Sequence, residues 1–156
     1  MNVSHIDAVV CEIRIDANPQ TVFAFFVDPN KMVRWIGSRV DLEPRPGGAC
    51  AIDMNPRIRA RGEYVEILPH SRVVFTWGWL GDEVVPPGSS TVEVTLTPEG
   101  DGTHVRLVHR GLLTADMREQ HRTGWQLYLP RLALAAVGGE PGPDPNSEQA
   151  REETHP

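Results

Sequence analysis

The stretch "HRGLLTADMREQHRTGWQLYLPRLALAAVGG", residues 109–139, carries the pattern of a long amphipathic helix. Thr114 is a suitable N-cap for such a helix, and Asp116 follows where a negative charge favours the positive end of the helix dipole. One stripe of residues then recurs at steps of three and four: His121, Gly124, Trp125, Tyr128, Leu132 and Ala136. We therefore predict a long C-terminal helix whose striped face meets a sheet.

Gly124 raises a question, because glycine inside a helix costs about 1 kcal/mol relative to alanine. Two explanations fit its place in the stripe. Either the helix backbone packs closely against the sheet, or room remains beside Trp125 for a bound molecule. Further along, Pro130 removes a hydrogen bond to the carbonyl of Gln126 and is expected to kink the helix.

The chain before this helix predicts strands and two short helices. "VVCEIRID" (residues 9–16) alternates between apolar and polar residues, as a half-buried strand does. "NPQTVFAFFVDPNKMVRWIG" (residues 18–37) holds two N-cap-plus-proline signals, each of which starts a short helix. Turn residues divide residues 38–111 into six more strands. The predicted class is α+β, with a strongly curved seven-stranded antiparallel sheet, two short helices and one long C-terminal helix.

Composition favours one soluble domain and excludes several functions. The chain has 156 residues, of which 40% are hydrophobic. It begins with no signal peptide and holds no membrane-spanning run, so we expect a cytoplasmic protein without membrane insertion. Cys11 and Cys50 have no metal-ligand spacing, and we expect neither metal nor cofactor. The net charge of -6, without a basic stripe, counts against binding to nucleic acid.

The last residues differ from the rest in composition. Residues 138–156, "GGEPGPDPNSEQAREETHP", contain five acids, one arginine and no aromatic residue. Such a segment buries too little apolar surface to offset the entropy of ordering it. We predict a single domain over residues 1–137, followed by an acidic disordered tail over residues 138–156.

Inward-facing aromatic and polar residues suggest a ligand pocket. A single inward tryptophan is usually a core residue, but four of them together are more suggestive. His109 shares a strand face with Val105 and Leu107, whereas His104 points away. The candidate ligand-binding residues are Trp35, Trp77, Trp79, His109, His121, Gly124, Trp125, Tyr128, Arg61 and Glu63.

The orientation of Arg61 and Glu63 stays open. Both lie on the strand face of Val65 and Ile67, so they face the cavity if those two aliphatic residues do. If Tyr64 faces the cavity instead, both charges are solvated, which avoids burying a charge without a partner. The sequence holds no nucleophile motif, no P-loop and no GxGxxG motif, and no catalytic residue is assigned.

Five motifs in a fixed order carry a resemblance that covers about residues 6–137. They are "VFAFFVDPNKMVRWIG", "RPGG", "GEYVEILPHSRVVFTW", "GDGTHVRLVHRG" and "HRTGW". In them the chain resembles the SRPBCC (START and Bet v 1-like) superfamily, and within it the bacterial AHSA1-like relatives of the Hsp90 ATPase activator domain. The resemblance implies a helix-grip fold with a cavity between the sheet and the long helix. Members bind lipids, sterols, hormones and aromatic polyketides, and some are cyclases or aromatases, so the fold does not fix the chemistry.

Three functions follow as hypotheses. The first is binding of a small, largely apolar, aromatic or lipid-like molecule in the cavity. The second is a cofactor-independent cyclase, aromatase or hydrolase-like enzyme, in which His109 or His121 acts as acid or base and Arg61 holds an enolate or carboxylate. The third is a protein-interaction role like that of the chaperone activator, marked by an exposed apolar patch. The sequence leaves the choice between monomer and homodimer open.

Overall fold

A computed structural model of the chain describes residues 8–147. Seven antiparallel strands form one sheet in the order β1-β7-β6-β5-β4-β3-β2, which confirms the predicted helix-grip architecture. The elements are β1 (Val9–Ile15), α1 (Pro19–Val27), α2 (Pro29–Met32), β2 (Arg39–Leu42), β3 (Ala49–Asp53), β4 (Arg59–Leu68), β5 (Arg72–Trp77), β6 (Ser90–Glu99), β7 (Gly102–Arg110) and α3 (Ala115–Ala136).

Each helix starts where the sequence predicts, because a side chain satisfies its first backbone N–H groups. The Asn18 side chain accepts from Thr21 N before α1, and the Asp28 side chain accepts from Asn30 N before α2. Thr114 Oγ1 accepts from Met117 N at the start of α3. The helix then continues through the exposed Pro130 to Ala136.

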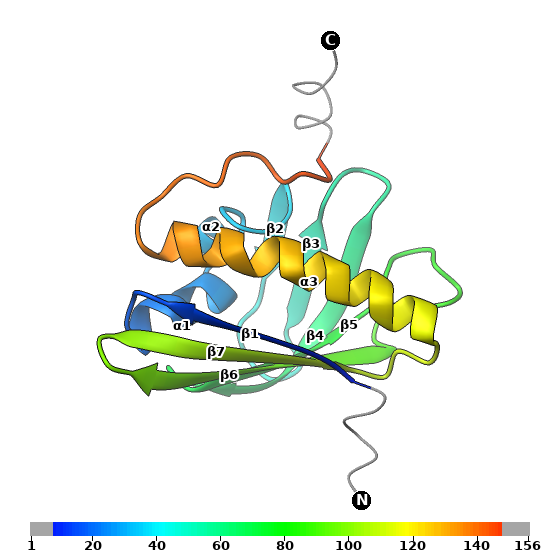
Figure 1. The fold of residues 1–156 in the computed structure, drawn as a ribbon. Helices are drawn as coiled ribbons and strands as arrows, with labels where there is room; N and C mark the ends of the chain where they lie inside the picture. Colours follow the sequence, from blue (N-terminus) through cyan, green and yellow to red (C-terminus); the bar gives the residue numbers. More distant parts are fainter. Residues whose placement is uncertain (1–7, 148–156) are drawn as a thin grey trace, which may run out of the picture.

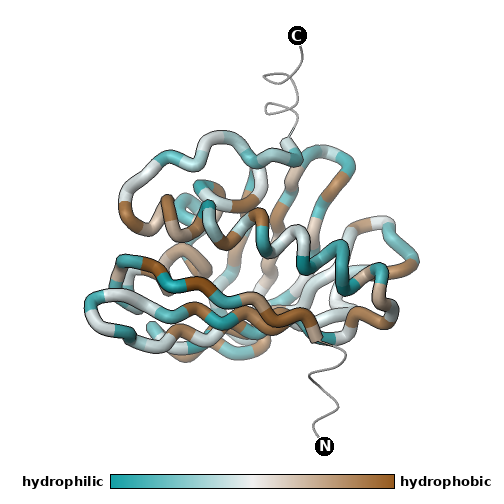
Figure 2. Tube along the Cα trace, viewed as in Figure 1, coloured by the Kyte–Doolittle hydropathy of each residue, from teal (hydrophilic) through white to brown (hydrophobic). Residues whose placement is uncertain are grey.

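The helix α3 lies across one face of the curved sheet, and α1 and α2 lie at one end of that layer (Figure 1). Val105, Leu107 and His109 of β7 are buried on the same side, as the alternation predicts, while His104 is partly exposed. Along α3 the first half is more hydrophilic than the second (Figure 2). Most of its buried residues accordingly lie in the second half, from Trp125 onward. No helix within residues 8–147 is long and apolar enough to cross a membrane.

The segment after α3 corrects the prediction of a disordered tail from residue 138. Residues 139–147, hereafter the strap, fold back over α3 toward the β3–β4 hairpin (Figure 1). Asp144 and Ser147 are buried, and Asn55 Nδ2 of the hairpin donates to Asn146 O at 2.7 Å. The prediction was wrong here because polar contacts with the body, rather than apolar burial, hold the strap. Residues 148–156 of the predicted tail lie outside the described residues.

Candidate functional site

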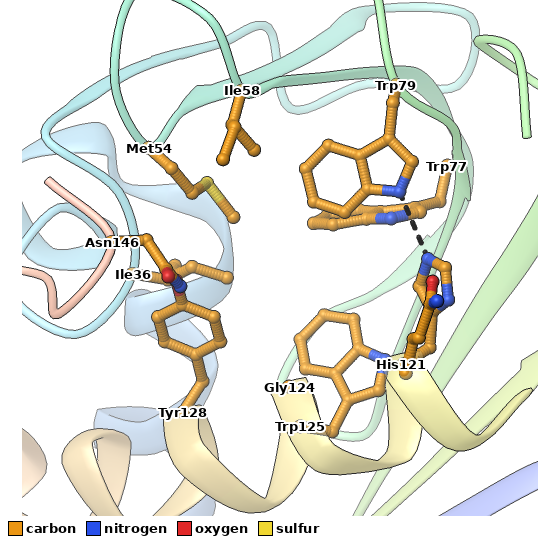
Figure 3. Close-up of a pocket in the computed structure, with 11 residues that line it drawn as sticks. Ile36, Met54, Ile58, Trp77, Trp79, His121, Gly124, Trp125, Tyr128 and Asn146 are labelled. Carbon is orange, nitrogen blue, oxygen red and sulfur yellow. Dashed lines mark hydrogen bonds between the residues drawn. The ribbon is translucent and has the colours of Figure 1, made fainter. Parts of the chain in front are cut away.

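A cavity of about 250 Å³ lies between α3 and the sheet. Tryptophans gather at one end of it, Tyr128 and Asn146 stand at the other, and Met54 and Ile58 lie across from the helix (Figure 3). The lining residues are Ile36, Met54, Ile58, Trp77, Trp79, Gln120, His121, Gly124, Trp125, Tyr128 and Asn146. Six of the ten candidate residues therefore line one cavity, and none of the eleven lining residues is an aspartate, glutamate, lysine or arginine.

Gly124 lies on α3 below the gap between Trp125 and Tyr128 (Figure 3). A Cβ atom placed on Gly124 would meet nothing within 4 Å outside its own helix backbone. Of the two explanations for this glycine, close packing of α3 against the sheet is therefore wrong, and open space beside Trp125 is what the structure contains. The missing side chain leaves volume in the cavity.

The tryptophan end is a cluster of rings in edge-to-face and tilted contact. The ring centroids of Trp77 and Trp79 lie 5.3 Å apart at 85°, and those of Trp77 and Trp125 lie 5.3 Å apart at 55°. Aromatic pairs favour such arrangements over face-to-face stacking, and each adds about 0.5–1.5 kcal/mol beyond its buried area. The three indole rings therefore form a well-packed wall, and their apolar surfaces line the cavity.

Behind this wall, His109 links Trp125 to Ser90 in a closed chain of hydrogen bonds. Trp125 Nε1 donates to His109 Nδ1 at 3.0 Å, which leaves that nitrogen without a proton. A neutral imidazole then carries its hydrogen on Nε2, which donates to Ser90 Oγ at 2.8 Å. The Ser90 hydroxyl in turn donates to Trp77 O at 2.8 Å. Both nitrogens of His109 are thus occupied by protein groups.

The hydrogen-bonding roles of the two ring nitrogens are reversed in His121. Its Nδ1 lies 2.7 Å from Met117 O, and a carbonyl oxygen only accepts, so Nδ1 carries the hydrogen. Its Nε2 accepts from Trp79 Nε1 at 3.1 Å. The two histidine rings meet edge to face, with centroids 5.0 Å apart.

Burial keeps both histidines neutral. Loss of hydration, and to a smaller extent the nearby His121, lowers the pKa of His109 to about 3. Burial also lowers the pKa of His121, although Met117 O and Asp82 act in the opposite direction. Two neutral, fully bonded imidazoles stabilise the tryptophan end, and neither nitrogen pair is arranged to take a proton from a bound molecule.

One buried donor in this region has no partner. Trp77 is 3% exposed, and its Nε1 is the single buried side-chain nitrogen or oxygen within residues 8–147 that lacks a hydrogen bond. Such an unsatisfied group typically costs 1–3 kcal/mol. Trp77 lines the cavity, but this nitrogen has almost no accessible surface and therefore lies within the packed wall.

The remaining candidate residues lie elsewhere. Arg61 is on the opposite face of β4, where its Nη1 donates to Asp53 Oδ1 at 2.6 Å, and Glu63 is exposed. Tyr64 takes the inner face instead and donates to Phe26 O at 2.8 Å. This outward orientation keeps both charged side chains in contact with water. The apolar side of β4 would offer neither of them an ionic partner.

Trp35 is a core residue rather than a lining residue. It is 1% exposed, packs edge to face on Phe26, and donates from Nε1 to Phe25 O at 3.0 Å. His109 likewise lies behind the cavity wall and does not line the cavity. His109 and His121 lie together, but Arg61 is on the opposite face of β4, so the acid–base histidine and the enolate-holding arginine of the cyclase hypothesis are not brought together.

Sequence reasoning missed five lining residues: Ile36, Met54, Ile58, Gln120 and Asn146. Gln120 could have been found, since it stands one turn before Gly124 on the same helix face. Ile36 and Met54 come from segments adjoining α2 and β3 that carry no periodic signal. Asn146 lies in the strap, which composition had assigned to disorder.

The family described as Activator of Hsp90 ATPase homolog 1-like protein matches residues 16–136. The chain belongs to this family. The AHSA1-like chain resembles the solution structure of an AHSA1-like protein from Rhizobium etli with 44% identity, over 88% of this chain and 86% of that one, at a TM-score of 0.71. No curated protein matches this chain.

The structures of CalU16 and DynU16 share the fold of this AHSA1-like chain. CalU16 from Micromonospora echinospora is 30% identical over 96% of this chain and 75% of that one, at a TM-score of 0.73. DynU16, a protein of the dynemicin biosynthetic locus, is 23% identical over 92% of this chain, at a TM-score of 0.78. The chain spans about half of DynU16, or 51% of its length. An Aha1 from Colwellia psychrerythraea with the same fold, 16% identical over 85% of this chain and 97% of that one at a TM-score of 0.75, is a dimer.

Proposed function

We propose that this AHSA1-like protein binds a small, neutral, largely apolar molecule in the cavity between the sheet and α3. The observation that carries the proposal is the cavity wall itself. It combines three tryptophans with open space at Gly124, and no charged side chain lines it. A charged ligand would lose its hydration there without gaining an ionic partner, which disfavours carboxylates and amines.

The size of the cavity restricts the ligand further. Pockets for drug-sized molecules span roughly 300–1,000 Å³, so a cavity of about 250 Å³ suits a compact molecule with one or two rings. The neutral amides of Gln120 and Asn146 line the cavity and add a polar requirement, because each can donate to an oxygen acceptor on the ligand. A neutral aromatic ketone or ether meets both requirements.

Exposed apolar side chains lie beside Trp79, next to the cavity. Ile58, Leu80 and Val84 are large hydrophobic residues that stay 43%, 47% and 63% exposed. Ile58 and Leu80 line one surface groove beside Trp79, and Val84 lines another. These apolar side chains lie among charged residues such as Arg57, Arg59 and Asp82, and they offer a first contact for an apolar molecule that leaves water.

A matched pair of probes tests the proposal. 2-Acetylnaphthalene and 2-ethylnaphthalene have nearly the same shape, but only the first carries an oxygen acceptor. We expect both to quench tryptophan emission and raise the melting temperature, because a ligand at 100 times its Kd adds about 2.7 kcal/mol of stability. The ketone should bind about tenfold more tightly, as one satisfied hydrogen bond predicts. The anionic 2-naphthoate is the negative control.

Gln120→Leu separates the polar contribution from the apolar one. Leucine keeps an apolar side chain at the wall but removes the amide. We expect the variant to bind the hydrocarbon as the unmodified protein does and to lose part of the preference for the ketone. If neither probe changes the emission or the melting temperature of the unmodified protein, the proposed function is wrong.

A further inference from the structure

The strap closes the end of the cavity that lies opposite the tryptophans. Asn146 lines the cavity and stands beside Tyr128 of α3 (Figure 3). Its Nδ2 donates to Tyr128 Oη at 2.9 Å. The family match ends at residue 136, so Asn146 belongs to a part of the chain outside that match, whereas Tyr128 lies within it.

Asp144 anchors the strap through both carboxylate oxygens. Its Oδ2 accepts from Gly37 N at 2.6 Å, and its Oδ1 accepts from Tyr128 Oη at 2.9 Å and from Asn146 N at 2.7 Å. The residue is 3% exposed, and a carboxylate that leaves water needs such donors. Burial and the charge of Asp144 raise the pKa of Tyr128, which keeps the phenol protonated and able to donate.

The other attachments of the strap are polar as well. Arg131 donates from Nη1 to Pro141 O at 3.0 Å and from Nη2 to Gly142 O at 2.7 Å, while its Nε donates to Trp35 O at 3.0 Å. Arg131 can exchange these carbonyl partners for water at small cost, because such a hydrogen bond contributes little net stability. A segment held in this way opens at a lower free energy than the sheet beneath it.

We propose that the strap completes the ligand site, with Asn146 as a ligand-contacting residue and Asp144 as the positioning residue that holds Asn146 and Tyr128 in place. The proposal rests on the proposed binding function. The amide of Asn146 offers a donor and an acceptor to polar substituents at this end of a ligand. Docking of the strap and binding of the ligand favour each other, because both stabilise the same positions of Asn146 and Tyr128. This coupling acts equally in both directions.

Two variants of the full chain test the coupling. Asp144→Asn keeps the size of the side chain but replaces one accepting oxygen with an NH₂ group, so it cannot accept at both Gly37 N and Tyr128 Oη. Glu140→Gln removes the same charge from the same strap. Its carboxylate is 86% exposed and contacts only Arg34 among the ion pairs of the described residues, which makes it the matched control.

Two measurements are made on each protein. Hydrogen exchange of the Gly37 amide reports strap opening, because that N–H is buried against Asp144, while the Val94 amide in β6 reports global unfolding. The Kd for 2-acetylnaphthalene reports binding. We expect Asp144→Asn to accelerate exchange at Gly37 at least about tenfold without an equal change at Val94, and to weaken binding by about tenfold. Glu140→Gln should change neither, and the bound probe should slow Gly37 exchange in the unmodified protein.

The outcomes separate this inference from the proposed function. Binding by the unmodified protein with an unchanged Kd in Asp144→Asn overturns the strap proposal and leaves the cavity function standing. Unchanged exchange at Gly37, or equal acceleration at Gly37 and Val94, also overturns it, since the strap would then not open on its own. Failure of the unmodified protein to bind either naphthalene probe overturns the proposed function, and the strap proposal with it.

Discussion

The two ends of the cavity are built on different physical principles. At the tryptophan end, rings from β5 and α3 pack on one another, and His109 closes the hydrogen bonds behind them. At the strap end, one buried carboxylate, Asp144, collects donors from a loop, a helix and its own segment. The first end is fixed by buried area and ring packing, and the second by exchangeable polar contacts.

This difference assigns different tasks to the two ends. A wall of interlocked rings keeps its shape whether or not the cavity is filled, because each ring is held by several neighbours. A wall held by polar contacts has an alternative in water at small cost. We infer that the tryptophan end sets the apolar shape of the site, whereas the strap end responds to the bound ligand.

The largest expected effect is on the tryptophan end. His109→Leu removes the acceptor of Trp125 Nε1 and the donor to Ser90 Oγ within a fully buried site. Leaving a buried donor unsatisfied is costly, so we expect a loss of about 2–4 kcal/mol in the free energy of unfolding, measured with urea. His104→Leu, on the outward face of the same strand, should change it by less than about 0.5 kcal/mol. Similar losses in both variants would contradict the ring-and-histidine account.

A pH dependence of nearly the same size follows from the neutral state of His109. Its pKa is lowered to about 3 in the folded protein, against a usual value of 6.5. The unfolded chain therefore takes up the proton first, and the stability that is present above pH 6.5 is lost as the pH falls toward the folded pKa. Between pH 6.5 and pH 4.5 we expect the unmodified protein to lose roughly 2 kcal/mol more than His109→Leu. Equal losses would show that the imidazole accepts a proton in the folded state.

Removal of the strap should cost less. A chain that ends at Gly139 loses the contacts of Asp144, and with them the partners of Gly37 N and Tyr128 Oη. Because water replaces most of these partners, we expect a decrease of only about 1–2 kcal/mol in the free energy of unfolding. In a domain of this size that corresponds to a drop of roughly 2–10 °C in Tm. An unchanged Tm would restore the interpretation of this segment as a disordered tail.

The sequence predicted one end of the cavity better than the other. Alternation along β7 placed His109 inward and His104 outward, and the three- and four-residue steps of α3 placed Gly124 beside Trp125. Periodicity works there because apolar burial decides which face turns inward. It could not foresee the strap, because the donors that hold it belong to residues such as Arg131, whose partners are backbone carbonyls with no sequence signature.

The strand β4 shows a second limit of periodicity. "RGEYVEI" alternates equally well with Val65 inward or with Tyr64 inward, and the register shifts between Tyr64 and Glu66. Tyr64 wins because its ring is buried against Phe75 and its hydroxyl finds Phe26 O. The orientation of Arg61 follows from that choice, and only tertiary contacts decide it.

The smallest expected effect on stability concerns the space between the two ends, at Gly124. Gly124→Ala improves helix propensity and meets no atom within 4 Å, so we expect it to raise the free energy of unfolding by up to about 1 kcal/mol. Gly124→Leu gains part of the same propensity and extends an isobutyl group into the gap between Trp125 and Tyr128. The leucine variant should therefore melt within a few degrees of the unmodified protein but lose most of its affinity for 2-acetylnaphthalene. A strongly destabilised leucine variant would mean that the rings and the strap close on each other in solution, since overpacking typically costs 1–3 kcal/mol. A stable leucine variant with full affinity would instead place the ligand away from Gly124, so the pair of substitutions tests the gap without disturbing either wall.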